Sequence, residues 1–209
     1  MPVKVNEREY RDIDLGGMEL RTLEDGQMVV EGYATKWNEY LLFEDEGYKV
    51  YERFDRHAFD KCDRSDIIMQ LNHEGRVYAR GGNNTLIVEP DDTGLKVTAY
   101  LGGTAEGRKI FEEIKGGYLT KMSHGFRKKT DKQEVIEDHE TGAIEVHRTI
   151  LEVAKEYDVS VVSLPANDAT EISARSFSEG VIAEVKQELQ AVEARTRTKK
   201  QIQTLAEFI

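Results

Sequence analysis

The pattern of apolar and polar residues predicts strands over the first hundred positions. Residues 28–35 form an apolar, β-prone run bounded by glycine. Residues 85–89 are strand-like and residues 95–101 alternate between apolar and polar side chains, while residues 90–94 between them are Pro-Asp-Asp-Thr-Gly, a turn-forming sequence. We therefore expect a β-hairpin over residues 85–101 and a strand-rich fold.

One helix is predicted together with both of its ends. It starts after Gly102-Gly103 with Thr104 as its N-cap, and Gly116-Gly117 ends it. Its buried face should be made by the apolar residues that recur at helical spacing, which are Ile110, Phe111 and Ile114.

Strands are expected again after this helix. The first runs through Ser123, and residues 128–141 are so rich in charge that an exposed loop or flap is predicted there. Two further strands are predicted at residues 143–150 and 159–164, and Pro165 ends the second.

The C-terminal residues have a different pattern. Apolar residues recur there at helical spacing between acids and lysines, which predicts an amphipathic helix: Val181, Ile182, Val185, Leu189 and Val192. Residues 175–180 have the composition of a linker. We therefore divide the chain into a main domain over residues 1–174 and a linker with a C-terminal helix over residues 175–209. The pattern fits equally a helix folded back on the domain and a helix that docks onto a partner.

Composition excludes several classes of protein. The chain has 209 residues, 39% of them hydrophobic, and a net charge of −11, which argues against binding to a nucleic-acid backbone. Cys62 is the single cysteine, so no internal disulfide can form and a reducing compartment is expected. Residues 1–7 lack the apolar core of a secretion signal, and no apolar run reaches the roughly 18 residues of a membrane span. We expect a cytosolic protein with no nucleic-acid or membrane partner.

Ser123 is the candidate nucleophile. Gly125 follows it two residues later, and glycine would allow a tight turn that exposes the hydroxyl and turns amide N–H groups toward an oxyanion. Lys121 stands where the nucleophile elbow of α/β-hydrolases has its first glycine, so that fold is not indicated.

His73 is the candidate base. It ends the apolar run at residues 67–69, which places its imidazole at the rim of a strand. Val77 stands where a zinc protease needs its second histidine, so no metal site is expected. His124 is a rival base, but neighbouring residues of an extended chain point to opposite faces, so His124 should face away from the groups that Ser123 needs.

Asp158 is the preferred acid. It opens a strand of valines that must be buried, so its carboxylate lies at the edge of the core and needs a hydrogen-bond donor, which His73 could supply. The sequence leaves other acids open, with Glu156 the nearest rival and Glu152 and Asp138 behind it. The order His73, Ser123, Asp158 differs from the three familiar triad orders.

Five short motifs lie in one order between residues 28 and 173. They are an aromatic-Asp-Arg-His-Ala-Phe segment at 54–59, Leu71-Asn72-His73, Asn84-Thr85-Leu86 with Asp92-Thr93-Gly94-Leu95, Met122-Ser123-His124-Gly125-Phe126, and Asp158-Val159-Ser160-Val161-Val162 through Pro165-Ala166-Asn167. In this order and spacing they resemble the prohead proteases of tailed phages of the HK97 type.

The resemblance implies a fold and a function. These serine proteases are similar in fold to herpesvirus assemblins, which implies a mainly β, α+β fold: a closed β-barrel ringed by helices. They cut the scaffolding part of the major capsid protein, and then themselves, inside the immature capsid. The expected partners are the capsid protein and further copies of this chain, the expected location is the capsid in the host bacterial cytoplasm, and no cofactor is expected.

The resemblance also implies site residues. His73 matches the family's histidine, Ser123 its nucleophile and Asp158 its acid. Arg148 matches a basic residue that either supports the oxyanion site or pairs with acids of the protein body. Two positions depart from the family: His124 stands where an apolar residue is common, and Asp158 where a longer glutamate is common, so the third member of the triad stays open between Asp158 and Glu156.

Two other functions remain as alternatives. An assembly or scaffolding protein that keeps the fold without chemistry would also suit an acidic body with an amphipathic tail. An esterase for small molecules is less favoured, because the sequence offers no apolar lid or acyl pocket.

Overall fold

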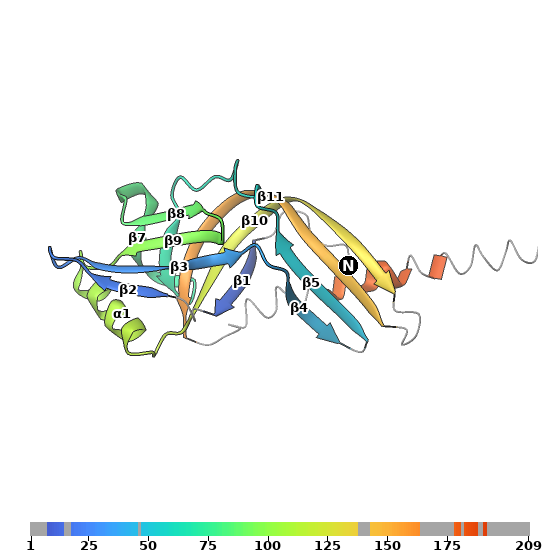
Figure 1. The fold of residues 1–209 in the computed structure, drawn as a ribbon, viewed down its shortest axis with the longest axis horizontal. Helices are drawn as coiled ribbons and strands as arrows, with labels where there is room; N and C mark the ends of the chain where they lie inside the picture. Colours follow the sequence, from blue (N-terminus) through green and yellow to red (C-terminus); the bar gives the residue numbers. More distant parts are fainter. Residues whose placement is uncertain are drawn as a thin grey trace, which may run out of the picture.

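The computed structural model describes residues 8–14, 18–45, 47–137, 143–163, 178–180, 182–187 and 190–191. Two β-sheets dominate these residues (Figure 1). One α-helix, α1 (Ala105–Lys115), and a 3-10 turn, η1 (Gly81–Asn83), accompany them.

The larger sheet has seven strands built around two long ones, β10 (Lys121–Glu137) and β11 (Ile144–Val162). β1 (Glu9–Asp14) pairs with β10 on its outer side. On the other side of β11, two strands share its length in parallel: β5 (Tyr48–Phe54) along Ile144–Ile150 and β6 (Ile68–Leu71) along Asp158–Val161. β4 (Tyr40–Asp45) pairs with β5, and β7 (Glu74–Arg80) pairs with β6.

The smaller sheet is antiparallel and has four strands in the order β2-β3-β9-β8. Their bounds are β2 (Glu19–Thr22), β3 (Met28–Lys36), β8 (Leu86–Pro90) and β9 (Gly94–Tyr100). The strand predicted at residues 28–35 is therefore confirmed, as is the hairpin, whose strands pair from Leu86 with Ala99 to Pro90 with Leu95.

Helix α1 is confirmed together with its predicted ends. The hydroxyl of Thr104 accepts a hydrogen bond from the Gly107 amide at 2.9 Å, which satisfies one of the free N–H groups of the first turn. Ile110, Phe111 and Ile114 are buried, so the helix packs its apolar stripe into the core.

The main core joins both sheets and α1. Its buried residues include Val97 and Leu95 from the smaller sheet, Met122 and Val159 from the larger sheet, and Phe111 from the helix. This core fixes the segment of β10 and β11 that carries Ser123 and Asp158. The site is therefore built on rigid strands rather than on loops.

The expected closed barrel ringed by helices is wrong. Among the described strands, β1 and β4 end the path of the larger sheet without pairing with each other, and β2 and β8 are the edges of the smaller one. Only α1 and η1 are defined as helices within the described ranges. The local patterns could not specify which strands pair, and the 19-residue strand β11 pairs with different neighbours at its two ends instead of closing a ring.

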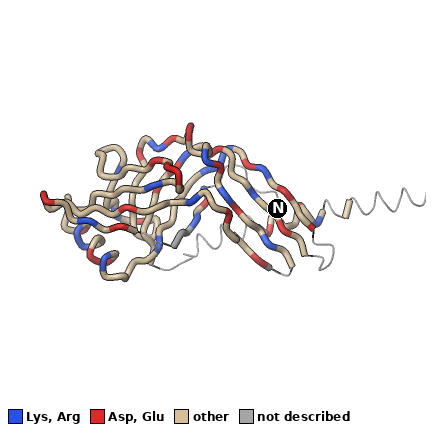
Figure 2. The backbone as a smooth tube through the Cα atoms, viewed as in Figure 1, with Lys and Arg blue, Asp and Glu red and all other residues tan. Residues whose placement is uncertain are grey.

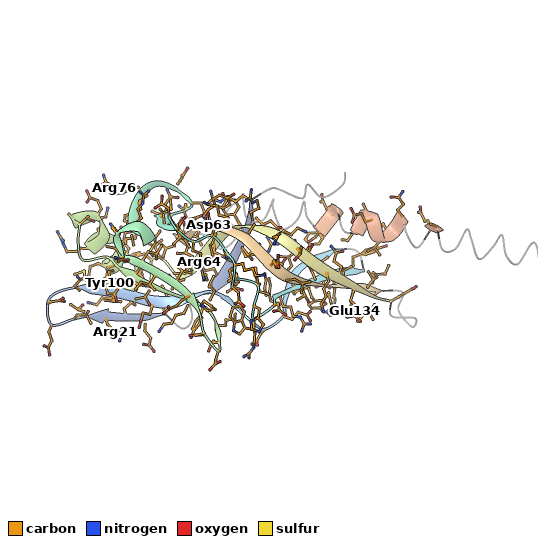
Figure 3. All side chains as sticks on the ribbon, turned by 90° about the horizontal axis from the view of Figure 1, so that it is seen from above. Arg21, Asp63, Arg64, Arg76, Tyr100 and Glu134 are labelled. Carbon is orange, nitrogen blue, oxygen red and sulfur yellow. The ribbon has the colours of Figure 1, made fainter. Side chains whose placement is uncertain are left out.

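The loop predicted over residues 128–141 is also wrong, because β10 continues through it to Glu137. Here β10 and β11 form an arm that leaves the main core, and Figure 3 shows Glu134 near the far end of the molecule from Tyr100 and Arg21. Figure 2 shows acidic and basic residues interspersed along these strands. Most β10 side chains over residues 129–137 are exposed while the backbones of the two strands pair, and Lys129 contacts Glu152 across the strands at 2.7 Å. The two strands predicted at 143–150 and 159–164 are likewise one strand, β11.

The expected C-terminal amphipathic helix is not among the helices that the structure defines. Backbone at 178–180 and 182–187 is helical, while Val181, Leu189 and Val192 lie outside the described residues. Ile182 and Val185 pack against the arm in a second, smaller core. The division at residues 174 and 175 falls outside the described residues and stays a prediction. Within the described part of the chain, no helix combines the length and the apolar character needed to cross a membrane.

Candidate active site

His73 lies in a two-residue turn between β6 and β7. Asn72 and His73 have φ angles of 53° and 60°, both in the left-handed region that hairpin turns of this length require. The Asn72 side chain accepts hydrogen bonds from the Ser163 amide at 3.0 Å and the Ser163 hydroxyl at 3.1 Å, while the Asn72 amide donates to Val161 O. The turn is thereby fixed to the end of β11, which holds the His73 imidazole in one place.

The structure brings His73 and Asp158 together. Nδ1 of His73 lies 2.5 Å from Oδ2 of Asp158, although the two residues are 85 positions apart in the chain. The hydroxyl of Ser160 donates to the same carboxylate oxygen at 2.6 Å. Both His73 and Asp158 are shielded from solvent, with side-chain exposures of 5% and 0%. The other oxygen, Oδ1, receives an ion pair from the guanidinium of Arg8.

Ser123 lies on the same face of the larger sheet. Its partner across β10 and β11 is Ser160, and the partner of Gly125 is Asp158, so all four residues face the same side. Ser123 is fully buried, and its hydroxyl has no hydrogen-bond partner among the described residues. Nε2 of His73 is also buried and has no hydrogen-bond partner among the described residues. No hydrogen bond therefore joins Ser123 to His73 in this state.

The turn expected at Ser123 and Gly125 is replaced by the first part of strand β10, with β1 on one side and β11 on the other. Gly125 has a different structural reason. A Cβ at this position would lie 2.5 Å from Oδ1 of Asp158 and 2.7 Å from Nε of Arg8. Glycine therefore leaves the space in which the carboxylate and the guanidinium meet.

Arg8 and Tyr10 belong to this site but were not foreseen from the sequence. Tyr10 is paired with Gly125, and its ring lies edge-on to the His73 ring with centroids 4.5 Å apart. Side chains of an extended strand point alternately to its two faces, and this was the available signal. Arg8 and Tyr10 face the site, while Glu9 and Arg11 face the opposite side.

The electrostatic surroundings keep His73 neutral. Burial, and after it the positive charge of Arg8, lowers the pKa of His73 from 6.5 to about 4. The carboxylate of Asp158 acts in the opposite direction, but Arg8 shares its charge. At neutral pH an ionised Asp158 can only accept, so Nδ1 of His73 carries the proton and Nε2 is left with a free lone pair. This is the protonation state of a general base.

The rival acids and the rival base lie elsewhere. His124 and Glu156 are both fully buried and contact each other, Nδ1 to Oε1 at 3.0 Å. His124 stacks on Phe126, on the side of the sheet away from Asp158, as the alternation predicts. Glu152 pairs with Lys129, and Asp138 lies outside the described residues. Asp158 is the acid that contacts His73, while the catalytic roles of these residues stay predictions.

Arg148 pairs with acids, the second of its two expected roles. It lies near the other end of β11, fully buried, and contacts Glu52 at 2.6 Å, Glu9 at 2.9 Å and Asp131 at 2.7 Å. Arg11 contacts Glu52 and Glu9 from the opposite side. We call these five residues the ion cluster.

The described residues contain no group of three or more histidine, cysteine, aspartate or glutamate side chains that could hold a metal ion. The segment that begins with His73-Glu74 forms the end of a turn and a strand, so it lacks the helix on which zinc proteases carry their ligands.

Replacing Gly125 with alanine should impair the site without unfolding the protein. The new methyl group would displace the Asp158 carboxylate or the Arg8 guanidinium, and misplacement of catalytic groups by about 1 Å can cost about 100-fold in rate. Peptide cleavage by the variant measures this loss. Gly103→Ala is the matched control, because a Cβ there meets nothing within 4 Å. Equal activity in both variants would contradict the role given to Gly125.

The family model described as caudovirus prohead serine protease matches residues 17–186. Among solved structures, the capsid assembly protease gp21 of bacteriophage T4 is similar with a TM-score of 0.39 and 11% sequence identity, over 75% of this chain and 99% of that one. This likeness is too distant to carry an argument. Among curated proteins, none matches the chain.

Proposed function

This chain belongs to the caudovirus prohead serine protease family, and we propose on that basis that it is an endopeptidase that matures the prohead. Its proposed substrates are the scaffolding part of the phage major capsid protein and the chain itself. The proposed place of action is the interior of the immature capsid in the host bacterial cytoplasm.

One observation carries the proposal within the structure. A buried His73–Asp158 pair and the buried Ser123 share one face of the sheet, and neither Nε2 of His73 nor Oγ of Ser123 has a hydrogen-bond partner within the described residues. A buried polar atom without a hydrogen bond costs about 1–3 kcal/mol, so two of them on one face require an explanation. A base and a nucleophile that act on substrate provide one.

The proposed mechanism is acyl transfer. Oγ of Ser123 attacks the scissile carbonyl carbon while Nε2 of His73 takes the hydroxyl proton, and Asp158 stabilises the resulting imidazolium through Nδ1–H. The imidazolium then gives its proton to the leaving amine, and water hydrolyses the acyl-enzyme with His73 again as base. Gly125 lies in a ladder between two strands, so it is not the turn that would aim amides at the oxyanion.

Co-expression with a capsid protein precursor tests the function. We expect the scaffolding segment to be removed and the products to be found by intact-mass spectrometry. A precursor that stays uncut in assembled proheads would contradict the proposal. Parallel assays on small esters and on polypeptides separate the endopeptidase from an esterase, since only the first requires cleavage of the polypeptide.

The complete burial of Ser123 favours one alternative, an assembly protein without catalytic activity. A fluorophosphonate probe distinguishes the two functions, because it reacts with a serine that a base activates. We expect the label on Ser123 and none on Ser160. Ser160 faces the same side, but its hydroxyl donates a hydrogen bond to Asp158. Proheads that form normally around an unlabelled, uncleaved chain would support the alternative.

A further inference from the structure

The segment that precedes the family match takes part in the candidate site. The match begins at residue 17, while β1 and Arg8 lie before it. β1 pairs with β10 over Lys121–Phe126, the stretch that contains Ser123 and Gly125. Arg8 and Tyr10 thereby reach His73 and Asp158 from a part of the chain to which the family assigns nothing.

The guanidinium of Arg8 is held between two aromatic rings. Its carbon lies 5.0 Å from the centre of the Tyr10 ring and 4.7 Å from that of the Tyr157 ring, which suits cation–π contacts on both. The missing side chain of Gly125 provides the remaining space. The Arg8 side chain is one third exposed at 34%, so its ion pair with the fully buried Asp158 closes the site toward solvent.

The two oxygens of the Asp158 carboxylate have separate partners. Oδ2 receives His73 and Ser160, and Oδ1 receives Arg8. A buried carboxylate with only neutral donors is costly. Arg8 supplies the opposite charge at Oδ1, which leaves Oδ2 directed at His73 and Ser160.

We propose that Arg8 is a positioning residue of the peptidase reaction, which fixes the orientation of the Asp158 carboxylate toward His73 and offsets part of its negative charge. The inference rests on the proposed function for its kinetic part only. Arg8 acts through Asp158 and contacts neither Ser123 nor the His73 ring in the described structure.

The charge of Arg8 also affects the proton affinity of His73. The titratable and charged groups around the imidazole are Arg8, Tyr10, Asp158 and, from β10, His124. Loss of the guanidinium would remove the positive charge that disfavours the imidazolium, while the Asp158 carboxylate would still favour it. The pKa of His73 should then rise, and the acid limb of kcat/KM should move to higher pH, by about one pH unit or more.

Three variants test the inference. Arg8→Gln keeps a polar side chain but removes the charge, Arg8→Lys keeps the charge, and Arg21→Gln removes an exposed arginine whose partner is Glu31 on the smaller sheet. The pH dependence of kcat/KM is measured on a peptide that spans a capsid cleavage site, and the imidazole of His73 is titrated by NMR in the same proteins.

We expect Arg8→Gln to raise the pKa of His73 and to move the acid limb of kcat/KM to higher pH. It should also lower kcat more than it changes KM. Arg8→Lys should restore both values in large part, and Arg21→Gln should match the wild type. A pKa of His73 that is equal in the wild type and in Arg8→Gln would overturn the inference. A wild-type chain that cleaves no peptide would instead overturn the proposed function, since the NMR titration does not depend on activity.

Discussion

Replacing Ser123 with alanine is expected to abolish processing of the capsid precursor, with kcat lowered by about a million-fold. This hydroxyl is the proposed nucleophile, and without it His73, which pairs with Asp158, has no hydroxyl proton to take. The fold should not suffer, because the buried hydroxyl makes no hydrogen bond to the described part of the chain that alanine would lose. Cleavage rates and the melting temperature measure the two effects.

Ser160→Ala is the matched control for this variant. Ser160 lies opposite Ser123 and is equally buried, but its hydroxyl donates to Asp158. Its loss should weaken the orientation of the carboxylate and slow cleavage far less than the loss of Ser123. The assignment of the nucleophile fails if the Ser123 variant processes the precursor at the wild-type rate, or if both variants lose activity to the same extent.

Replacing Arg148 with methionine is expected to have the largest effect on stability, about 3–5 kcal/mol, because it removes one of the two guanidiniums that face the buried carboxylates of Glu9 and Glu52. Arg148 contacts Glu52, Glu9 and Asp131, and Arg11 and Lys128 are the other cations beside these acids. Methionine fills similar space but removes one of three positive charges that face three negative ones. Chemical denaturation at neutral pH measures the change.

The pH dependence of stability gives a second readout for Arg148. Burial alone would raise the pKa of Glu52, but the guanidiniums of Arg11 and Arg148 outweigh it and lower the pKa from 4.5 to about 2. Glu52 therefore contributes stability that is complete above about pH 4.5 and is lost as the pH falls toward 2. In the Arg148 variant the pKa of Glu52 should rise, so acid unfolding should begin at higher pH.

Arg53→Met serves as the control, because Arg53 is the exposed neighbour of Glu52 on β5 and contacts only the Thr149 hydroxyl among its side-chain hydrogen bonds in the described residues. Exposed substitutions of this kind usually change stability by less than about 0.5 kcal/mol. Similar losses in Arg53→Met and Arg148→Met would contradict the importance of the ion cluster.

Local signals predicted local structure well. Helix α1 is specified by signals that lie within or next to it: the cap at Thr104, the glycines after Lys115 and the spacing of Ile110, Phe111 and Ile114. The hairpin of β8 and β9 is equally local, since its turn residues stand between its strands. In both cases the interactions that decide the structure join residues close in sequence.

Pairing between distant strands could not be predicted in this way. The polar residues of the β10 arm were interpreted as a loop because a solvated strand pair needs no apolar residues, only backbone partners. The barrel was expected because the family resemblance implied it, and the local patterns could not show which strands are neighbours. Which strand lies beside β11 depends on packing between residues about a hundred positions apart, as for β5.

The candidate site was predicted in part. His73 and Asp158 were foreseen as a pair because one ends an apolar strand and the other begins one, and the structure places them in contact. Gly125 was interpreted as a turn, whereas its lack of a side chain serves the close approach of Asp158 and Arg8. Arg8 was missed because no pattern within residues 8–14 indicates which distant carboxylate an arginine will meet.

Strand β1 contributes side chains to both faces of the sheet, so a single register of β1 against β10 positions both sets. Arg8 and Tyr10 serve one face of the sheet, and Glu9 and Arg11 join the ion cluster on the other. A slip by a single residue would exchange these faces, turn the acidic Glu9 toward the Asp158 carboxylate and remove Arg11 from Glu52. The reactive groups and the buried charges that stabilise the arm are thus assembled by the same hydrogen-bonded alignment, so neither can form correctly without the other.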